Sequence, residues 1–342
     1  MKWKKRIGIW IVLSLSLQFL GLFYINHYFL ATDSKVVTKK FVYDKSKIVK
    51  NKDIIVPANA KTISVSYDAK YLSYFENEEL KIINCSDGKI ENIKAEDGTK
   101  ISFFKWLPDR NRMLLVEKKS DAKSSDLVLY SYDVLKSEKV KIKELALGGI
   151  NSEVKDIKLS PLTGVTYVLV ISGDKSSSIY RIDRMGEMTK TSTIPSSVGN
   201  MAAVRHEDKL VYEGLVYNKI YATSGDQPIS IKGVEKLTLI GTDFEDNMYL
   251  GEVKNNLVTK IYYGKILEDT GKWKVLNLPI PCTKDDLFIS SDGKVYQNDA
   301  PKSVIKEVDS GAQTSYEGKI LQLYTKGIVI LLNSKISFVA FK

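Results

Sequence analysis

Hydrophobic residues follow two different patterns along this chain. Ile7 to Ala31 form a run of 25 residues with no acidic or basic side chain apart from His27. From residue 57 onward, apolar or alternating runs of five to eight residues recur, separated by Gly, Asp, Asn and Ser. The long run is sufficient for a membrane-spanning helix, which needs about 20 residues. The short runs are typical of β-strands, so we expect the rest of the chain to be nearly all β.

A cleaved signal peptide and an uncleaved anchor both begin with a basic tail and an apolar run. The apolar core of a signal peptide has about 7–15 residues, fewer than this run contains. Cleavage after Ala31 would also place the bulky Phe29 where a small residue is needed. Trp10 and other aromatic residues lie near the two ends of the run, where their rings favour the headgroup region. We therefore predict a transmembrane signal anchor over residues 7–31.

The charge of the protein is concentrated at its N-terminus. The sequence has 51 Lys and Arg against 41 Asp and Glu, a formal net charge of +10. Residues 1–53 contain eleven basic and three acidic side chains and so carry +8, which leaves +2 for the rest. A nucleic-acid partner is not expected, because its usual signature is a basic folded domain. The basic stem over residues 32–56 is instead expected to contact anionic lipid or a cell-wall polymer.

The same charges bear on membrane orientation. Residues 1–6 carry four basic side chains, as a cytoplasmic tail does. The stem is basic too, but long domains cross the membrane largely regardless of their charge. We expect residues 1–6 to form a cytoplasmic tail and the C-terminal domain to lie outside the cytoplasm, at the cell envelope. The alternative is the same domain facing the cytoplasm as a regulatory interaction module.

Small and polar residues recur at helical spacing within the apolar run. Ser14, Gln18 and Gly21 are separated by four and three residues, so they share one face of the predicted helix. Such a face can dock a second membrane helix. The alternative is that a lone membrane span simply tolerates a few uncharged polar residues.

The strand pattern after residue 57 repeats. An Ile-Tyr-like pair that leads into an Asp or Gly turn returns at intervals of 41 to 50 residues. The pairs are Ile82-Ile83, Leu129-Tyr130, Ile179-Tyr180, Ile220-Tyr221, Ile261-Tyr262 and Val304-Ile305. A four-stranded propeller blade takes about 40–45 residues, so the period predicts blades arranged in a ring. Residues 165–171 are apolar at successive positions, as expected for a strand packed between two neighbouring blades.

Turn sequences support this interpretation. Ser66-Tyr67-Asp68-Ala69-Lys70, Leu107-Pro108-Asp109-Arg110, Ser160-Pro161-Leu162 and Ser290-Ser291-Asp292-Gly293-Lys294 each precede the second strand of a unit, and two further units keep only Asp208 and Asp246. These turns resemble the Ser-Pro-Asp-Gly-Lys turn of TolB-type and dipeptidyl-peptidase-IV-type propellers, which are related to WD-repeat proteins. The resemblance covers about residues 57–342 and implies a fold rather than an activity. The turn residues Asp68, Asp109, Pro161, Asp208, Asp246 and Asp292 are accordingly interpreted as structural.

Seven blades are the preferred number. Six units extend to about residue 316, and three more strands follow them. Residues 36–43 could supply the fourth strand of this last blade and close the ring, which would leave no open sheet edge. Six or eight blades are the alternatives, because the last unit is short. The domain prediction is thus a tail, an anchor, a stem over 32–56 and a propeller over 57–342.

The residues offer little for catalysis. The sequence has two histidines, and His206 lies in a predicted turn. Cys85 and Cys282 are 197 residues apart and are expected to be free thiols. No Gly-x-Ser-x-Gly elbow, zinc-ligand cluster, calcium loop or phosphate-binding glycine loop occurs in the sequence, so we expect no catalytic, cofactor or metal site and no hydrolase domain.

The sequence is compatible with two functional hypotheses. The first is an anchored protein-binding, scaffolding or sensory module with a protein partner, since propellers present loops on a rigid frame. The second is a carbohydrate-active or other lytic enzyme that uses two carboxylates in the funnel, with candidates at Glu76, Glu78, Glu79 and Asp285-Asp286. Lys outnumbers Arg 45 to 6, a usage typical of low-GC Gram-positive bacteria. The first hypothesis, without enzymatic activity, is preferred.

Overall fold

The computed structural model describes residues 2–25, 54–120, 125–145, 151–324 and 326–341. The chain divides into two units, Met1–Val49 and Lys50–Lys342. The first contains helix α1 (Lys2–Tyr24). Its segment Lys5–Tyr24 is long and apolar enough to cross a membrane, by length and composition. The predicted anchor over 7–31 therefore has a helix over most of its length, and the end of that range lies outside the described residues.

Strands of the second unit form seven antiparallel sheets within the described residues, which we call blades 1 to 7 in chain order. Blade 1 consists of β2 (Lys61–Val65), β3 (Tyr71–Glu76), β4 (Glu79–Asn84) and β5 (Ile90–Ile93). Blade 2 consists of β6 (Lys100–Trp106), β7 (Arg112–Ser120), β8 (Ser125–Asp133) and β9 (Glu138–Leu145). Blade 3 consists of β10 (Glu153–Leu159), β11 (Thr166–Ile171), β12 (Ser177–Ile182) and β13 (Met188–Thr191).

The second half of the unit continues this order. Blade 4 consists of β14 (Val198–Ala203), β15 (Leu210–Gly214) and β16 (Lys219–Ala222). Blade 5 consists of β17 (Leu237–Thr242), β18 (Asn247–Lys254), β19 (Leu257–Lys265) and β20 (Lys274–Cys282). Blade 6 consists of β21 (Leu287–Ile289), β22 (Val295–Asp299), β23 (Val304–Glu307) and β24 (Gln313–Ser315). Blade 7 consists of β25 (Lys319–Tyr324), β26 (Gly327–Leu332), β27 (Lys335–Ala340) and β1 (Ile54–Ile55). Three short 3-10 helices connect strands in blades 5 and 6, namely η2 (Thr270–Lys272), η3 (Lys284–Asp286) and η4 (Ala300–Lys302).

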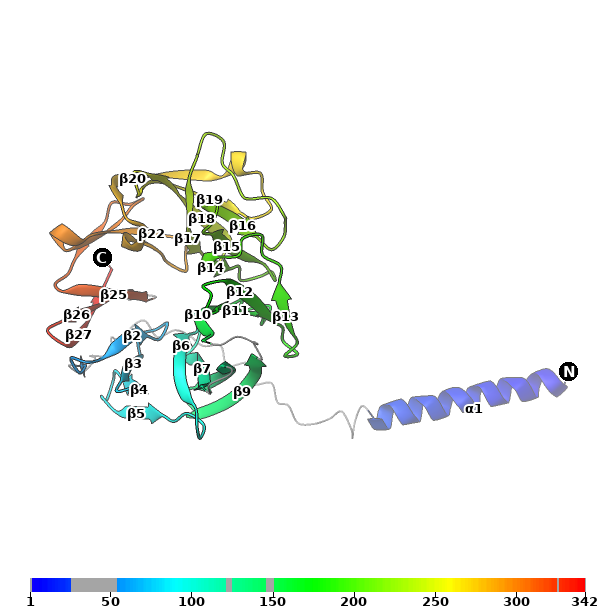
Figure 1. The fold of residues 1–342 in the computed structure, drawn as a ribbon. Coiled ribbons are helices and arrows are strands. Elements are labelled where there is room, and N and C mark those ends of the chain that lie inside the picture. The colour runs from blue at the N-terminus through cyan, green and yellow to red at the C-terminus, as the bar shows by residue number, and fades with distance from the viewer. Residues whose placement is uncertain (1, 26–53, 121–124, 146–150, 325, 342) are drawn as a thin grey trace. The chain divides into compact units, whose positions relative to one another are not determined.

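The seven blades follow one another around a ring, as Figure 1 shows by the colour order. We call the centre of this ring the central channel. The first strands of neighbouring blades contact one another, in the pairs β2 with β6, β6 with β10, β10 with β14, β14 with β17, β17 with β21 and β25 with β2. These first strands therefore line the channel. The predicted seven-bladed propeller is confirmed, and all six Ile-Tyr-like pairs of the repeat lie in third strands.

Apolar side chains pack between blades rather than within single sheets. The described residues contain seven buried clusters, and each of them joins two neighbouring blades. In β11, Val168 packs toward blade 2, whereas Tyr167 and Leu169 pack toward blade 4. This alternation explains why the strand is apolar at successive positions, since both of its faces are buried.

Blade 4 departs from the predicted four strands. The structure describes residues 223–236, and beyond β16 they make one isolated bridge, between Ile229 and Ile220. Pro228 precedes this bridge and has no N–H to donate to a ladder, and Gly225 begins the segment with a turn. In this blade the outer strand is therefore reduced to a single bridge, because the segment that would form it carries residues that break a strand.

The last blade is completed by the N-terminal strand β1. Ile54 pairs with Ile336 and Ile55 pairs with Lys335, so β1 lies beside β27. Residues 36–43, to which the sequence assigned this role, lie outside the described residues; the strand found in the position is Ile54–Ile55. Joining the two ends of the chain in one sheet leaves blade 7 anchored from both sides.

Candidate binding site at one end of the central channel

The turns between first and second strands, which we call the first turns, lie at the same end of the channel. All seven first strands line the channel, and the turn in each blade leaves from the same end of its strand. Each of the predicted turn residues Asp68, Asp109, Pro161, Asp208, Asp246 and Asp292 lies in a first turn. In four of these turns one residue has a positive φ, namely Ala69 at 56°, Gly164 at 72°, Asp246 at 63° and Gly293 at 82°.

Three of the predicted aspartates mainly brace their own turns. Asp68 accepts hydrogen bonds from Ser66 and from the backbone N–H of Lys70, and Asp292 accepts one from Ser290 at 2.6 Å. Asp109 forms a two-point contact with Arg110. The bond from Lys70 to Asp68 joins a side chain to a backbone group two residues away, a pattern that favours turns over strands. Asp68 also accepts a hydrogen bond from the side-chain amide of Asn111 in the first turn of blade 2, at 3.2 Å.

Two other predicted aspartates bind the neighbouring blade. Asp208 of blade 4 accepts hydrogen bonds from Tyr167 and Arg181 of blade 3, the latter at 2.5 Å from Nη2. Burial opposes the charge of Asp208, but the bonds from Arg181 and Tyr167 prevail and hold its pKa below the usual range. Asp246 of blade 5 accepts hydrogen bonds from the backbone N–H of Arg205 and from the ring Nδ1 of His206, in blade 4.

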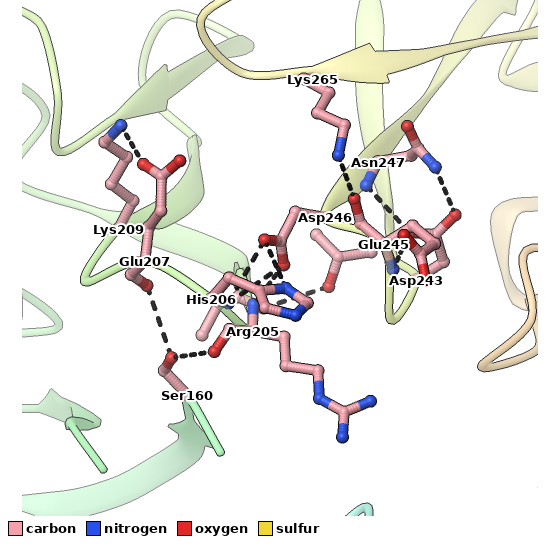
Figure 2. Close-up of polar contacts among 12 residues, drawn as sticks. Ser160, Arg205, His206, Glu207, Lys209, Asp243, Glu245, Asp246, Asn247 and Lys265 are labelled. Carbon is pink, nitrogen blue, oxygen red and sulfur yellow. Dashed lines mark hydrogen bonds and ion pairs between the residues drawn. The ribbon is translucent and has the colours of Figure 1, made fainter. Parts of the chain in front are cut away.

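Figure 2 shows how these contacts connect three successive blades. Ser160 of blade 3 donates to the carbonyl oxygens of Arg205 and Glu207 in blade 4, at 3.0 and 3.4 Å. Asp246 of blade 5 approaches the same turn from the other side. The first turn of blade 4 is therefore held by hydrogen bonds from both neighbours, and its side chains project from a fixed backbone.

A cavity of about 450 Å³ opens beside these turns. Its wall is formed by the ends of the first strands of blades 2 to 5 and by the turns that follow them, including Pro161. The residues that matter for its chemistry are Lys105, Asp156, Lys158, Arg205, Asp243 and Phe244. The cavity is thus part of the central channel, at the end where the first turns lie.

One carboxylate between two ammonium groups lies on the cavity wall. Asp156 of β10 contacts Lys105 of β6 and lies 3.2 Å from Lys158 of its own strand. Burial, with the nearby charge of Lys158, lowers the pKa of Lys105 to about 8, and Asp156 opposes this. Burial alone would raise the pKa of Asp156, but the two lysines hold it below its usual range. The group carries one net positive charge at neutral pH.

The second carboxylate of the cavity is fully engaged by its own turn. Asp243 accepts hydrogen bonds from the backbone N–H groups of Glu245 and Asn247, both at 2.9 Å. It also accepts from the side-chain amide of Asn247 at 2.7 Å and from the hydroxyl of Tyr249 at 2.9 Å. Figure 2 shows Asn247 and Asp243 facing one another within this turn. Asp243 therefore stabilises the turn, and its oxygens have little capacity left to accept hydrogen bonds from a group in the cavity.

Arg205 contributes a cation with a different environment. Its guanidinium carbon lies 4.3 Å from the ring centre of Phe244, in a cation–π contact. Its Nε is buried, and no acceptor among the described residues reaches it. Figure 2 shows the side chain of Arg205 extending away from His206 and Asp246. The backbone of Arg205 is thus held by Asp246, while its side chain keeps donors free for another group.

The carboxylates proposed for a funnel enzyme are not gathered here. Glu76, Glu78 and Glu79 lie in or beside the turn between β3 and β4, and Glu76 pairs with Lys81 at 2.5 Å. Asp286 lies in η3 and accepts hydrogen bonds from Thr283 and Asn298. None of them lines the cavity. Of the acidic residues that do line it, Asp156 is paired with lysines and Asp243 is bound by its own turn.

The remaining sequence candidates lie apart from the cavity. Cys85 and Cys282 are free and buried, and burial raises the pKa of the Cys85 thiol to about 12 and that of Cys282 to about 11. Among the described residues, no group of three or more His, Cys, Asp or Glu side chains is placed to hold a metal ion. Ser14, Gln18 and Gly21 lie on α1, where Ser14 and Gln18 share a surface with Trp10. Docking of a second helix on this face stays a prediction.

The fold is similar to solved propeller structures at low sequence identity. A chain of a mitotic checkpoint complex has a TM-score of 0.53 at 12% identity, over 88% of this chain and 98% of that chain. Hsv2p of Kluyveromyces lactis has a TM-score of 0.49 at 17% identity, over 80% and 89%. Dipeptidyl peptidase 4 of Porphyromonas gingivalis has a TM-score of 0.47 at 9% identity, over 74% and 44%. Comparison of the sequence with family models and with curated proteins gives no match. At this identity the similarity shows the fold alone, which is the β-propeller described above.

Proposed function

We propose that this protein is a membrane-anchored scaffold whose propeller binds a protein partner at the cell envelope. The proposal rests on the geometry at the end of the channel where the first turns lie. There, hydrogen bonds between blades fix a rim of turns around a cavity that exposes cationic side chains. A rigid rim of loops around a concave centre suits recognition of another protein.

The carboxylates of the cavity do not favour the alternative of a glycosidase. A glycosidase needs two carboxyl groups that face each other and are available to act as acid and base or nucleophile. In the described cavity wall, Asp156 is neutralised by two lysines and Asp243 accepts four hydrogen bonds. His206 has a carboxylate partner in Asp246, but it lies exposed in a turn. We therefore propose a binding function without catalysis.

Crosslinking in membranes tests the binding proposal. Wild-type protein with an affinity tag would be crosslinked in intact cells, solubilised and purified, and its covalent partners identified. A matched chain that keeps residues 1–53 but lacks the propeller serves as the control. We expect a partner that depends on the propeller. Recovery of the same proteins with both chains, or of none under several crosslinking chemistries, would contradict the proposal.

Membrane orientation is part of the same proposal and can be measured by cysteine labelling. Both native thiols are buried and have raised pKa values, so they should give a low background. Met185→Cys places a thiol at a position that is 88% exposed on the propeller. We expect a membrane-impermeant maleimide to label M185C in intact cells and K2C only after lysis. The reverse pattern would place the propeller in the cytoplasm.

The basic stem is proposed to hold this end of the protein near anionic headgroups or wall polymer. Residues 1–53 carry +8 of the total charge. Each lysine near an anionic surface contributes on the order of 1 kcal/mol, and salt screens the attraction. Binding of the peptide 32–56 to anionic vesicles should therefore fall as salt rises, and equal binding to neutral vesicles would refute this role.

A further inference from the structure

The cavity in the channel has an excess of positive charge that its own residues do not balance. Three cations line it, Lys105, Lys158 and Arg205, and two carboxylates, Asp156 and Asp243. One of these carboxylates lies between the two lysines, and the other is bound within its own turn. Arg205 has no carboxylate partner in the described part of the chain, and the five charged groups together leave one net positive charge at the cavity.

The donors of Arg205 are prepared for a ligand. The cation–π contact with Phe244 positions the guanidinium group, and Asp246 holds the backbone through a 2.5 Å hydrogen bond from the N–H of Arg205. The Nε–H is out of contact with solvent and has no acceptor. A buried donor without a partner is costly, and a bound acceptor would relieve this cost. Guanidinium groups in fixed orientation bind planar oxyanions through two parallel hydrogen bonds.

The size and the lining of the cavity favour one kind of anion. Its volume of about 450 Å³ exceeds what a small inorganic ion occupies, and Leu159, Met201 and Phe244 give it apolar walls. One net positive charge is balanced by one carboxylate, whereas a phosphate would leave an excess of negative charge. An acidic side chain on a peptide brings a single charge together with apolar atoms that can contact these walls.

We propose that this cavity binds an acidic peptide segment of the partner protein, with an Asp or Glu carboxylate held by Arg205 and oriented by the charges of Lys105 and Lys158. This inference rests on the proposed function and specifies its ligand. The hydrogen bonds between blades 3, 4 and 5 hold the binding groups in place before the peptide arrives. The ligand would therefore enter a site that needs little reorganisation.

Fluorescence anisotropy of the full chain in detergent micelles tests the inference with a labelled hexaglutamate peptide as probe. Hexaglutamine is the matched neutral peptide. We expect hexaglutamate to bind more tightly than hexaglutamine, with an affinity that falls as salt rises. Arg205→Met should weaken hexaglutamate binding by about tenfold or more, and Lys158→Met by a smaller factor. Lys190→Met, at an exposed position of β13, is the control and should bind as the wild type does.

Additional measurements distinguish the class of ligand, a folding defect of the variant and a failure of the proposed function. Thermal melting shows whether R205M is folded, and R205K keeps the charge but loses the planar fork, so its affinity should lie between those of wild type and R205M. Free acetate is expected to compete with the probe more effectively than inorganic phosphate. Equal binding of both peptides, stronger competition by phosphate, or wild-type affinity in a folded R205M would overturn the inference. If crosslinking still captured a propeller-dependent partner in that case, the proposed function would stand without this ligand.

Discussion

Polar groups have different partners on the two sides of the central channel. At the seam between blades 7 and 1, Gln322 of β25 accepts hydrogen bonds from Ser64 and from the N–H of Val65, and it donates to the carbonyl of Val65 at 3.0 Å. The neutral side-chain amide of Gln322 thus satisfies both the N–H and the carbonyl of Val65 in the facing strand. On the side of blades 2 to 5, charged groups line the channel instead, and one of them keeps an unused donor.

This difference indicates a structural role for the seam and a binding role for the cavity. Gln322 uses its carbonyl oxygen twice and one of its two amide N–H groups inside the protein, so little remains for a ligand. The charged groups that line the cavity, Lys105, Lys158, Arg205, Asp156 and Asp243, together leave one positive charge. We therefore expect changes at the seam to alter stability and changes at the cavity to alter binding.

Closure of the ring by β1 should have the largest effect on stability. Ile54 is 3% exposed and belongs to the cluster between blades 7 and 1, whereas its neighbour Ile55 is 71% exposed. Ile54→Asp would bury a charge without a partner and should lower the free energy of unfolding by about 4 kcal/mol. Ile55→Asp is the matched control and should change it by about 0.5 kcal/mol or less. Chemical denaturation measures both, and similar losses would show that β1 does not close the ring.

Loss of the seam amide should have an intermediate effect. Gln322→Leu removes three hydrogen bonds and leaves the N–H and the carbonyl of Val65 without the side chain that satisfies them. We expect a loss of about 2 kcal/mol in the free energy of unfolding, measured by urea denaturation. Gln313→Leu, at an exposed position of β24, is the control. An unchanged stability of Q322L would show that this amide does not stabilise the seam.

Removal of the acidic group of the cavity should cost less stability but increase binding. Asp156→Asn leaves Lys105 and Lys158 without their carboxylate, and we expect a loss of about 1–2 kcal/mol because both lysines are about one third exposed. The same change adds one net positive charge to the cavity. Hexaglutamate should therefore bind D156N more tightly than wild type in an anisotropy titration. Weaker binding would contradict the assignment of the cavity as an anion site.

The pH dependence of binding should be the smallest of these effects. The pKa of Lys105 is lowered to about 8, chiefly by burial, so this group loses its charge as the pH rises through 8. Asp156 and Lys158 on β10 face it, and Asp156 stays ionised there because its own pKa is lowered. Hexaglutamate affinity should thus fall by up to about tenfold between neutral pH and pH 9. In Lys105→Met the fall should disappear, and its persistence would assign it to another group.

Linkage gives the sign of the corresponding stability effect. Lys105 has a lower pKa in the folded chain than in the unfolded chain, so between pH 8 and the usual value of 10.5 the unfolded state binds more protons. The free energy of unfolding therefore gains from this group as the pH rises through that window. Wild type should become more stable relative to K105M over the same range, as chemical denaturation would show.

Much of the ring could be predicted from the sequence because its signals are local and repeated. Third strands recur with the blade period, and a strand such as β11 is apolar on both faces because it packs between two blades. The closing strand could not be located in this way. Ile54–Ile55 is two residues long and has no period, so its role depends on a contact with β27 at the other end of the chain.

The cavity could not be predicted for a related reason. Lys105, Asp156 and Arg205 are about 50 residues apart in the sequence, and only the closed ring brings them together. One local signal was available, since Lys105 interrupts the otherwise apolar end of β6, beside Trp106. A charged residue at a channel-facing position of a first strand indicates a polar cavity, but its partner and its net charge require the neighbouring blades.

The most direct test of the division between seam and cavity is the hexaglutamate affinity of Q322L compared with that of R205M. Both variants would be measured by anisotropy in the same buffer, with thermal melting of each sample as the record of stability. We expect Q322L to melt at a lower temperature than wild type and to bind hexaglutamate as wild type does, and R205M to melt near wild type and to bind about tenfold more weakly. Equal affinity of R205M and wild type, with both folded, would contradict the assignment of the cavity as the binding site.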